Sequence, residues 1–301
     1  MSGVRIGVDI GGTKIDAVVV DENAEVLGRH RIAVRKGHQG VVDAAVEAVA
    51  TLTAEAGISV TDALSIGVGI PGTVTDGVVH HAQNLDVHEL DLASALREAW
   101  GRDVFVENDV TAAAVGAWQI VAPERRSVAY LNLGTGLAAG IILDGKLWRG
   151  AYGAAGEIGY ISVDPRGPED PEGNPGGLET YASGSGIVLQ WGADGSDARA
   201  IMAAAAKGDP AAEAIRDRLY FGVASAIRVL VLAYDVEEVI IGGGLTGLGD
   251  SLLDGTTAVL DDWSSKSAFL NSLKLTERTR MLEGYRPVAA IGAALLGVDN
   301  G

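Results

Sequence analysis

The start of the chain alternates short apolar runs with polar or glycine turns. The apolar runs predict β-strands at Val4–Asp9, Ile15–Val20 and Val26–Ile32. Apolar residues at helical spacing then predict a helix over Val41–Ala56, which ends at Gly57. A strand meander that continues into a helix favours an α/β fold.

The alternation continues to about residue 118. A short apolar strand is predicted over Ala63–Gly69, and a helix over Leu90–Trp100. Val104–Val106 follows as a strand, and an alanine-rich helix is predicted from Asp109 to about Trp118. These elements complete one α/β domain.

The opening pattern returns after Pro123. Strands are predicted at Val128–Leu133, Ala138–Leu143 and Lys146–Trp148, again with a glycine turn after the first. A repeat of this size implies two related α/β domains. We expect a smaller domain over 1–118, completed by a C-terminal helix at about 288–301, and a larger domain over 119–287. The alternative that two unrelated hairpins merely look alike stays open.

Three later segments complete the pattern. Asp164–Gly177 is rich in Pro, Gly and acidic residues, which predicts a long loop of the kind that is often functional. Asp209–Tyr234 is predicted as a long helix and Val239–Ile241 as a buried strand. A helix of small residues, Val288–Leu296, closes the pattern.

Composition excludes several classes of protein. The 301 residues carry 23 Lys and Arg against 40 Asp and Glu, a formal net charge of −17, so binding to nucleic acid has no electrostatic basis. We find no signal peptide and no apolar run of membrane-spanning length, which predicts a cytoplasmic protein with no membrane partner. The chain has no cysteine, so disulfides and thiolate metal sites are excluded.

The first glycine turn is a candidate phosphate site. Gly11, Gly12, Thr13 and Lys14 follow a strand that ends in Asp9. Glycines let main-chain N–H groups crowd around an anion, and Asp9 could hold Mg²⁺ directly or through water. Such a turn is also simply a tight hairpin, and its spacing is not that of a Walker P-loop.

Two later glycine turns are also candidate nucleotide contacts, and the first of them favours the phosphate interpretation. Gly134, Thr135 and Gly136 repeat the first turn, and two such loops could grip one polyphosphate. Gly242-Gly243-Gly244 ends a buried strand, where bare backbone permits close approach of a flat ligand such as a purine base. A flexible turn at the end of the strand is the alternative for this last segment.

Asp109 is the candidate general base. Asn108-Asp109 stands where a strand ends and a helix begins, so Asp109 is either an N-cap or a catalytic carboxylate. Open α/β sheets place ligands at the carboxyl ends of strands, which favours the catalytic role. The positive end of the helix is expected to keep Asp109 ionised.

Taken in order, seven motifs resemble the ROK (repressor, open reading frame, kinase) family of sugar kinases over nearly the whole chain. The motifs are Asp9–Lys14, Pro71–Val74, Glu107–Asp109, Leu133–Gly136, Gly156–Gly159, Leu178–Gly184 and Ile241–Gly244. The resemblance implies an actin-like (RNase H-type) two-domain ATPase fold of the α/β class, with ATP and sugar in an interdomain cleft. It also implies a homodimer. Too little chain precedes Gly11 for the DNA-binding helix-turn-helix of the family's repressors.

The resemblance also implies roles for individual residues. Asp109 is similar to the catalytic base of the family. The candidate sugar contacts are Gly72, Thr73, Asn84, Asn108, Glu157, Tyr160 and Glu179. The candidate nucleotide contacts are Asp9, Gly11, Gly12, Thr13, Lys14, Gly134, Thr135, Gly136, Gly242, Gly243 and Gly244, with Mg²⁺ at Asp9.

Two departures from the family pattern concern a zinc site. The family motif Cys-x-Cys-Gly-x-x-Gly-Cys-x-Glu aligns with residues 170–179, which keep the glycines and Glu179 but have no cysteine. The family histidine that follows Glu-x-Gly is Tyr160 here. We therefore expect no zinc, and a sugar pocket that differs from that of the zinc-containing members.

The sequence leaves three functions open. The first is an ATP-dependent hexose kinase, with glucose as the first choice and mannose, fructose or an N-acetylhexosamine as alternatives. The second is a sugar-binding sensor of the same fold with little turnover. The third is a kinase that uses polyphosphate, because glycine turns hold phosphates without selecting the rest of the donor.

Overall fold

The computed structural model describes residues 3–192, 197–284 and 286–297, and contacts between residues group them into two compact units. The first unit comprises Met1–Arg126, Gly140–Ala155 and Gly284–Gly301. The second comprises Ser127–Ala139 and Gly156–Glu283. The two predicted domains, 1–118 completed by 288–301 and 119–287, stay a prediction.

A mixed five-stranded sheet forms the centre of the first unit, in the order β3-β2-β1-β4-β8. Its strands are β1 (Arg5–Ile10), β2 (Lys14–Val20), β3 (Val26–Ala33), β4 (Ile66–Ile70) and β8 (Phe105–Asn108). β1, β2 and β3 are antiparallel neighbours, whereas β1, β4 and β8 run parallel. The parallel strands therefore end at the same edge of the sheet.

A second mixed sheet has the order β11-β10-β9-β12-β13. Its strands are β9 (Val128–Leu133), β10 (Leu137–Leu143), β11 (Lys146–Trp148), β12 (Glu238–Gly242) and β13 (Thr279–Met281). β9, β12 and β13 are parallel neighbours, and β10 and β11 are antiparallel. The two sheet orders correspond strand for strand, which confirms that the sequence repeat is a repeat of structure and not two similar hairpins.

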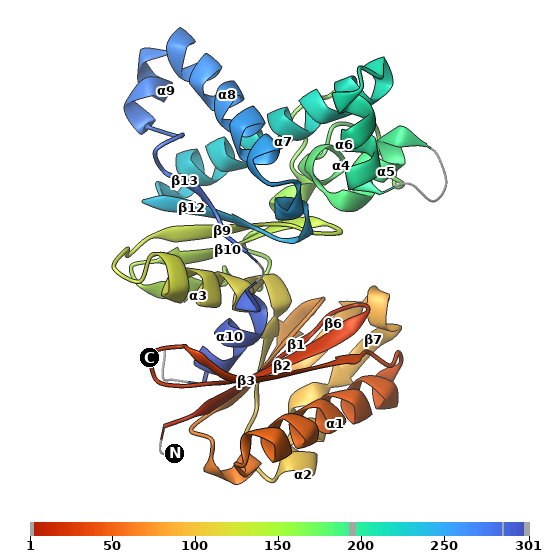
Figure 1. Cartoon of the computed structure of the whole chain (residues 1–301), viewed down its shortest axis with the longest axis vertical. Helices are drawn as coiled ribbons and strands as arrows, with labels where there is room; N and C mark the ends of the chain where they lie inside the picture. Colours follow the sequence, from red (N-terminus) through yellow and green to blue (C-terminus); the bar gives the residue numbers. More distant parts are fainter. Residues whose placement is uncertain (1–2, 193–196, 285, 298–301) are drawn as a thin grey trace. The chain divides into compact units, whose positions relative to one another are not determined.

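Helices cover both faces of the first sheet. Figure 1 shows α1 (His38–Ala56) against one face, and α10 (Val288–Leu295) packs on the other against β1, β4 and α3 (Asp109–Val121). Glycines allow this close packing, because a Cβ on Gly7 would lie 1.8 Å from the Ala290 carbonyl oxygen. The small residues of α10 thus let a helix close to the chain end lie directly on the central strands.

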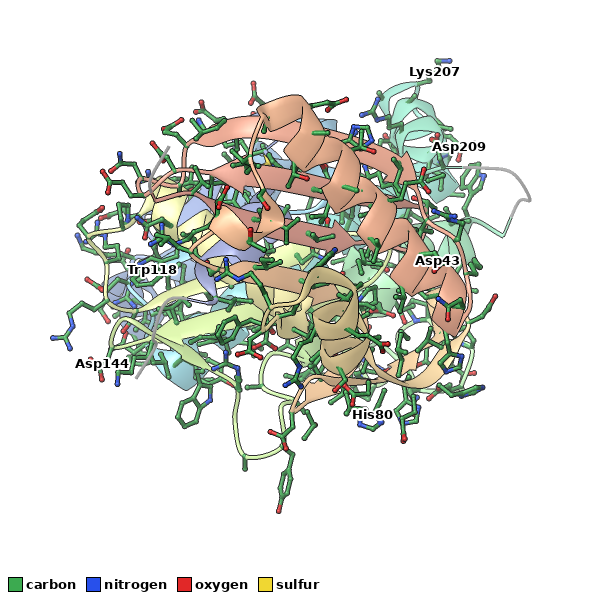
Figure 2. The ribbon with its side chains drawn as sticks, turned by 90° about the horizontal axis from the view of Figure 1, so that it is seen from below. Asp43, His80, Trp118, Asp144, Lys207 and Asp209 are labelled. Carbon is green, nitrogen blue, oxygen red and sulfur yellow. The ribbon has the colours of Figure 1, made fainter. Side chains whose placement is uncertain are left out.

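The second unit is rich in helices. They are α4 (Leu178–Ala182), α5 (Gly184–Trp191), α6 (Ala198–Ala206), α7 (Pro210–Tyr234), α8 (Asp250–Lys266) and α9 (Ala268–Leu273). Figure 2 labels Lys207 and Asp209 at the turn between α6 and α7, where the Asp209 carboxylate accepts the N–H groups of Ala211 and Ala212. This cap explains why the long predicted helix begins at Pro210.

The structure adds elements and changes one. The strands β5 (Thr73–Thr75), β6 (Val78–Ala82) and β7 (Val87–Asp91) form a small antiparallel sheet of their own, which the apolar pattern did not predict. The helix predicted from Leu90 starts two residues later as α2 (Leu92–Trp100), because the Asp91 carboxylate accepts the Ser94 N–H at 2.9 Å. Leu90 and Asp91 instead end β7. Short 3-10 turns are η1 (Val60–Asp62), η2 (Gln83–Leu85), η3 (Ile158–Tyr160) and η4 (Gly244–Leu248).

Within the described residues, no helix combines the length and the hydropathy that crossing a membrane requires.

Candidate active site

Three parallel strands of the first unit carry their polar residues to one edge of the sheet. Asp9 in β1 lies opposite Gly69 in β4, and Gly69 lies opposite Glu107 in β8. Asn108 ends β8, and Asp109 begins α3. The register thus places Asp9 and the Asn108-Asp109 pair at the carboxyl ends of β1 and β8, the two parallel strands on either side of β4. The carboxyl ends of strands are the usual position of ligands in open α/β sheets.

Asn108, not Asp109, caps the helix. Its Oδ1 accepts the N–H groups of Val110 and Thr111 at 2.9 and 3.0 Å, and its Nδ2 donates to the Gly72 carbonyl at 3.1 Å. The alternative that Asp109 is an N-cap is therefore wrong. Asn108 instead joins the start of α3 to the turn at Gly72, and Asp109 occupies the first helical position.

The electrostatics of Asp109 differ from the expectation. Burial raises its pKa, and the Val110 N–H, which donates to Oδ1 at 3.0 Å, lowers it by less. Loss of hydration destabilises the charged form of this carboxyl group; the N–H groups of Val110 and of Asp109 itself stabilise that form, but by less. A carboxylate with a raised pKa takes up a proton more readily, which suits a general base.

Asp9 shares this environment. Burial, followed by the negative charges of Asp109 and Asp16, raises its pKa to about 7, against the lowering effect of Lys14 and Arg31. A divalent cation would offset this excess of negative charge, and Mg²⁺ in proteins is held by one or two carboxylates together with substrate phosphates and waters. The residues present therefore fit a magnesium ion at Asp9.

The first glycine turn closes the β1–β2 hairpin. The Gly11 N–H donates to the Lys14 carbonyl at 2.9 Å, and the side chains of Thr13 and Lys14 are exposed. A Cβ on Gly12 would lie 3.3 Å from the Cβ of Asn84, in η2. The turn is thus a hairpin whose exposed tip borders Asn84. A tight hairpin and a phosphate site are therefore compatible interpretations of this turn.

The sequence reasoning missed the arginine partners of two carboxylates in this sheet, Asp16 and Glu107. Asp16 is buried in β2 and receives the Arg29 Nε at 2.8 Å and the Arg31 Nη2 at 2.7 Å. Glu107 is nearly buried and receives the Arg149 Nε at 2.6 Å. The available signal for the partners of Asp16 was the alternation of acidic and basic residues on neighbouring predicted strands. Nothing in the local sequence indicated the partner of Glu107.

The later glycine turns lie together in the second unit. β9 and β12 are parallel, with Gly242 opposite Asn132, so both turns follow the carboxyl ends of adjacent strands. Gly243 has a φ of 87°, and a Cβ there would lie 2.6 Å from the Leu133 carbonyl oxygen. Only glycine allows this approach of one turn to the other.

Helix α5 holds the turn at Gly134. The Gly184 N–H donates to the Gly134 carbonyl at 2.8 Å, and Ser185 donates to the Thr135 carbonyl from its N–H at 3.0 Å and from its hydroxyl at 2.7 Å. These bonds occupy the turn's carbonyl oxygens. A phosphate at this turn would therefore meet less negative partial charge from these carbonyl groups.

Glu179 lies against the same turn. It stands in the first turn of α4, and its Oε2 accepts the Leu137 N–H at 2.9 Å. A Cβ on Gly136 would come within 2.6 Å of that oxygen. Glu179, although 42 residues after Leu137 in the sequence, therefore lies directly against the turn of Gly134, Thr135 and Gly136.

Glu157 precedes η3 and Tyr160 is its last residue, and this turn lies close to Glu179. Both side chains are exposed, Tyr160 by 76 %, and a Cβ on Gly159 would lie 3.2 Å from the Glu179 Cβ. Burial of part of the ring, and then the charges of Glu179, Glu172, Glu157 and Asp170, raise the pKa of Tyr160. The tyrosine thus keeps its proton at neutral pH and can donate a hydrogen bond.

A cavity of about 830 Å³ lies within the second unit beside these residues. Its walls include Tyr160, Asp170, Pro175, Glu179, Ser185 and Leu189. In the first unit, Thr73 is an exposed residue at the start of β5, next to Gly72. The predicted site residues thus form two groups, one in each compact unit: Asp9 to Lys14, Gly72, Thr73, Asn84, Asn108 and Asp109 in the first, and the others in the second.

Comparisons with known proteins agree with these motifs. The model of the ROK family matches residues 5–281. The glucokinase of Streptomyces coelicolor is 33% identical over 99% of this chain and 95% of its own length, and the N-acetylmannosamine kinase of Citrobacter koseri is 30% identical over 82% and 85%. A crystal structure of a ROK family glucokinase from Streptomyces griseus, in complex with glucose and AMPPNP, superposes with a TM-score of 0.78 at 33% identity, covering 98% of this chain and 99% of that one.

These similarities confirm two predictions, those of the fold and of the family. The fold is the α/β, actin-like ATPase fold of the family, with two mixed sheets. A cysteine zinc site is absent because the chain has no cysteine. With a family match over most of its length and the family's kinases as full-length relatives, the chain belongs to the ROK family and is one of its sugar kinases.

Proposed function

We propose that this protein transfers the γ-phosphate of ATP to a hydroxyl group of a hexose, with Asp109 as the general base. The observation that carries the proposal is the division of roles at the end of β8. Asn108 takes the capping role, and this leaves the Asp109 carboxylate, with its raised pKa, at the carboxyl ends of the parallel strands.

In the proposed reaction the sugar hydroxyl oxygen bonds to the γ-phosphorus as the bond to the bridging oxygen of ADP breaks. Asp109 accepts the hydroxyl proton. Glu157, Tyr160 and Glu179 offer hydrogen bonds to the sugar, as do Asn84 and Asn108. Bound at Asp9 and the phosphates, Mg²⁺ would supply positive charge that neutralises the phosphate oxygens.

The donor and the acceptor are supported by the relatives. The Streptomyces griseus structure contains glucose and the ATP analogue AMPPNP, and the Streptomyces coelicolor relative is a glucokinase. Glucose is therefore the first choice of acceptor. The Citrobacter koseri relative keeps an N-acetylhexosamine open, and mannose and fructose stay alternatives. The proposed nucleotide contacts are main-chain N–H groups of the three glycine turns.

The test is a coupled ADP-release assay with ATP and Mg²⁺ across a panel of hexoses. Asp109→Asn should lower kcat at least about a hundredfold, because the amide cannot accept the proton. Asp103→Asn is the matched control, since the Asp103 side chain is 85% exposed and lies outside the site. An Asp109→Asn variant that keeps most of the wild-type kcat would contradict the assignment of the base.

The other two functions are separable in the same experiment. A sensor would bind one hexose in calorimetry without releasing ADP. A polyphosphate-dependent kinase would form sugar phosphate when polyphosphate replaces ATP. The homodimeric state and the cytoplasmic location stay predictions, which gel filtration with light scattering and cell fractionation would test.

A further inference from the structure

The loop Asp164–Gly177 lies between two proposed sugar ligands in the sequence, Tyr160 and Glu179. It contains no helix and no strand; Glu169 and Pro175 form an isolated bridge within it, and Gly177 at its end forms another with Ser162. A loop of this length loses much conformational entropy when it becomes ordered. Specific interactions must therefore hold it.

A zinc ion, which the family resemblance would place here, does not fit these residues. Zinc sites in proteins use three or four Cys, His or carboxylate ligands. The positions that align with the three cysteines are Asp170, Glu172 and Gly177, and Tyr160 stands in place of the histidine. Within the described residues, no group of three His, Cys, Asp or Glu side chains lies close enough to hold a metal ion.

The Asp170 carboxylate instead holds the tip of the loop together through hydrogen bonds. Its Oδ1 accepts the N–H groups of Glu172 and Asn174, both at 2.9 Å, and its Oδ2 accepts the Asn174 Nδ2 at 3.1 Å. Its main chain adds two bonds, from the Asp170 N–H to the Asn174 carbonyl and from the Gly173 N–H to the Asp170 carbonyl, both 3.0 Å. Five hydrogen bonds thus converge on one residue.

A second aspartate holds the base of the loop. The Asp164 carboxylate accepts the Arg166 N–H and the Tyr181 hydroxyl, each at 3.0 Å. Next to it, the Val163 N–H donates to the Gly176 carbonyl at 2.9 Å. Because Tyr181 belongs to α4, this contact ties the loop to the helix that carries Glu179.

The loop closes directly beside the two sugar ligands. Ser162 and Gly177 form a bridge, and the Leu178 N–H donates to the Ile161 carbonyl at 3.0 Å. Asp170 and Asn174 also line the cavity of about 830 Å³ together with Tyr160 and Glu179. A change in the tip of the loop therefore alters the wall of the cavity that Tyr160 and Glu179 also line.

We propose that Asp170 is a positioning residue for the sugar site, whose hydrogen bonds order the loop 164–177 without a metal and so keep Tyr160 and Glu179 in place. The inference rests on the proposed function, in which these two side chains contact the sugar. Hydrogen bonds to a charged carboxylate are among the strong ones in proteins, which makes the metal unnecessary here.

The test compares Asp170→Ala with Asp170→Asn and with Glu172→Gln as the control. Glu172 is exposed in the same loop, so its variant removes one charge and none of the bonds described. Asp170→Ala should speed hydrogen exchange across 164–177 and raise KM for the preferred hexose about tenfold, with kcat changed less than about threefold. Asp170→Asn keeps an oxygen that accepts both N–H groups, so its KM and its exchange rates should be nearer to those of wild type. Treating the wild type with 1,10-phenanthroline in excess Mg²⁺ should leave KM unchanged.

Three results would overturn the proposal. They are an Asp170→Ala variant with wild-type exchange and KM, a Glu172→Gln variant with the same rise in KM, and a rise in KM after phenanthroline. If Asp170→Ala also speeds hydrogen exchange in β9, the substitution disturbs more than the loop, and Asp170→Asn is compared with wild type instead. Wild-type KM and wild-type exchange in both Asp170→Asn and Glu172→Gln would then support the role of the side-chain oxygen at position 170. Absence of turnover on every sugar would defeat the proposed function, whereas exchange would still decide whether Asp170 orders the loop.

Discussion

The Nε of Arg149 donates to Oε2 of Glu107 at 2.6 Å, and Oε1 of the same carboxylate accepts the main-chain N–H of Asn108 at 3.0 Å. A residue that follows β11 thereby holds the strand end from which Asn108 and Asp109 project. The Glu107 side chain is only 12% exposed, so little water reaches its carboxylate and the Arg149 guanidinium supplies a hydrogen-bonding partner in its place.

Removing Arg149 should therefore weaken the fold and the reaction together. Arg149→Ala is expected to lower the free energy of unfolding by about 1–3 kcal/mol, because Glu107 would keep a poorly solvated charge without its cation. It should also lower kcat as the strand end loosens. Denaturant unfolding and the ADP-release assay measure the two effects. Adding Glu107→Gln should restore part of the stability; a single variant as stable as wild type would show that water replaces the guanidinium.

The pH dependence of the reaction follows from the raised pKa of Asp109. A general base works only without its proton, so kcat/KM should fall as the pH falls through this pKa. Because the pKa is raised, the fall should begin at a higher pH than an ordinary aspartate would give. Steady-state assays between about pH 4 and 8 measure it, with circular dichroism at each pH to separate protonation from unfolding. An acid limb at the ordinary pKa of aspartate would count against the assignment.

Packing of α10 on the first sheet depends on glycines in β1 and β4. A Cβ on Gly67 would lie 1.8 Å from the Ala293 carbonyl oxygen, with main chain on both sides of the contact. Gly67→Ala should thus destabilise the protein by about 3 kcal/mol or more, since backbone cannot move aside as a side chain can. Gly28→Ala is the control: its Cβ would meet only side chains, at 3.6 Å and beyond. Equal melting temperatures for the two variants would contradict the described packing.

The contact between Gly136 and Glu179 predicts a specific effect on the sugar. In Gly136→Ala the new Cβ would lie 2.6 Å from Glu179 Oε2, so the carboxylate must turn away and leave the Leu137 N–H. We expect KM for the hexose to rise about tenfold, consistent with the loss of one or two hydrogen bonds to a charged group, while the melting temperature changes little. Kinetics over a range of hexose concentrations measure this. A variant in which only KM for ATP rises would assign Gly136 to the nucleotide alone.

Much of the fold could be predicted because its determinants are local. The strands β1, β2 and β3 and the repeat of this pattern at β9, β10 and β11 follow from apolar runs separated by glycine or polar turns. The glycine turns were identified for the same reason. Helix α2 shows the limit of such patterns, because one capping bond at Asp91 moved its start from Leu90 to Leu92. The sheet β5-β6-β7 was missed since its short, partly exposed strands give no clear apolar run.

The sequence by itself determined the α/β class, the repeated pattern of strands and glycine turns, the absence of any cysteine metal site and the family, since each depends on residue type and spacing along the chain. Only the tertiary structure decided which residue caps α3, that Arg149 supports Glu107, and that Glu179 lies against Gly136. The physical reason is the same in each case. These contacts join residues that are neighbours in space through hydrogen bonds and packing, and the pKa of Asp109 and Asp9 depends on how much protein surrounds them, which no local pattern specifies.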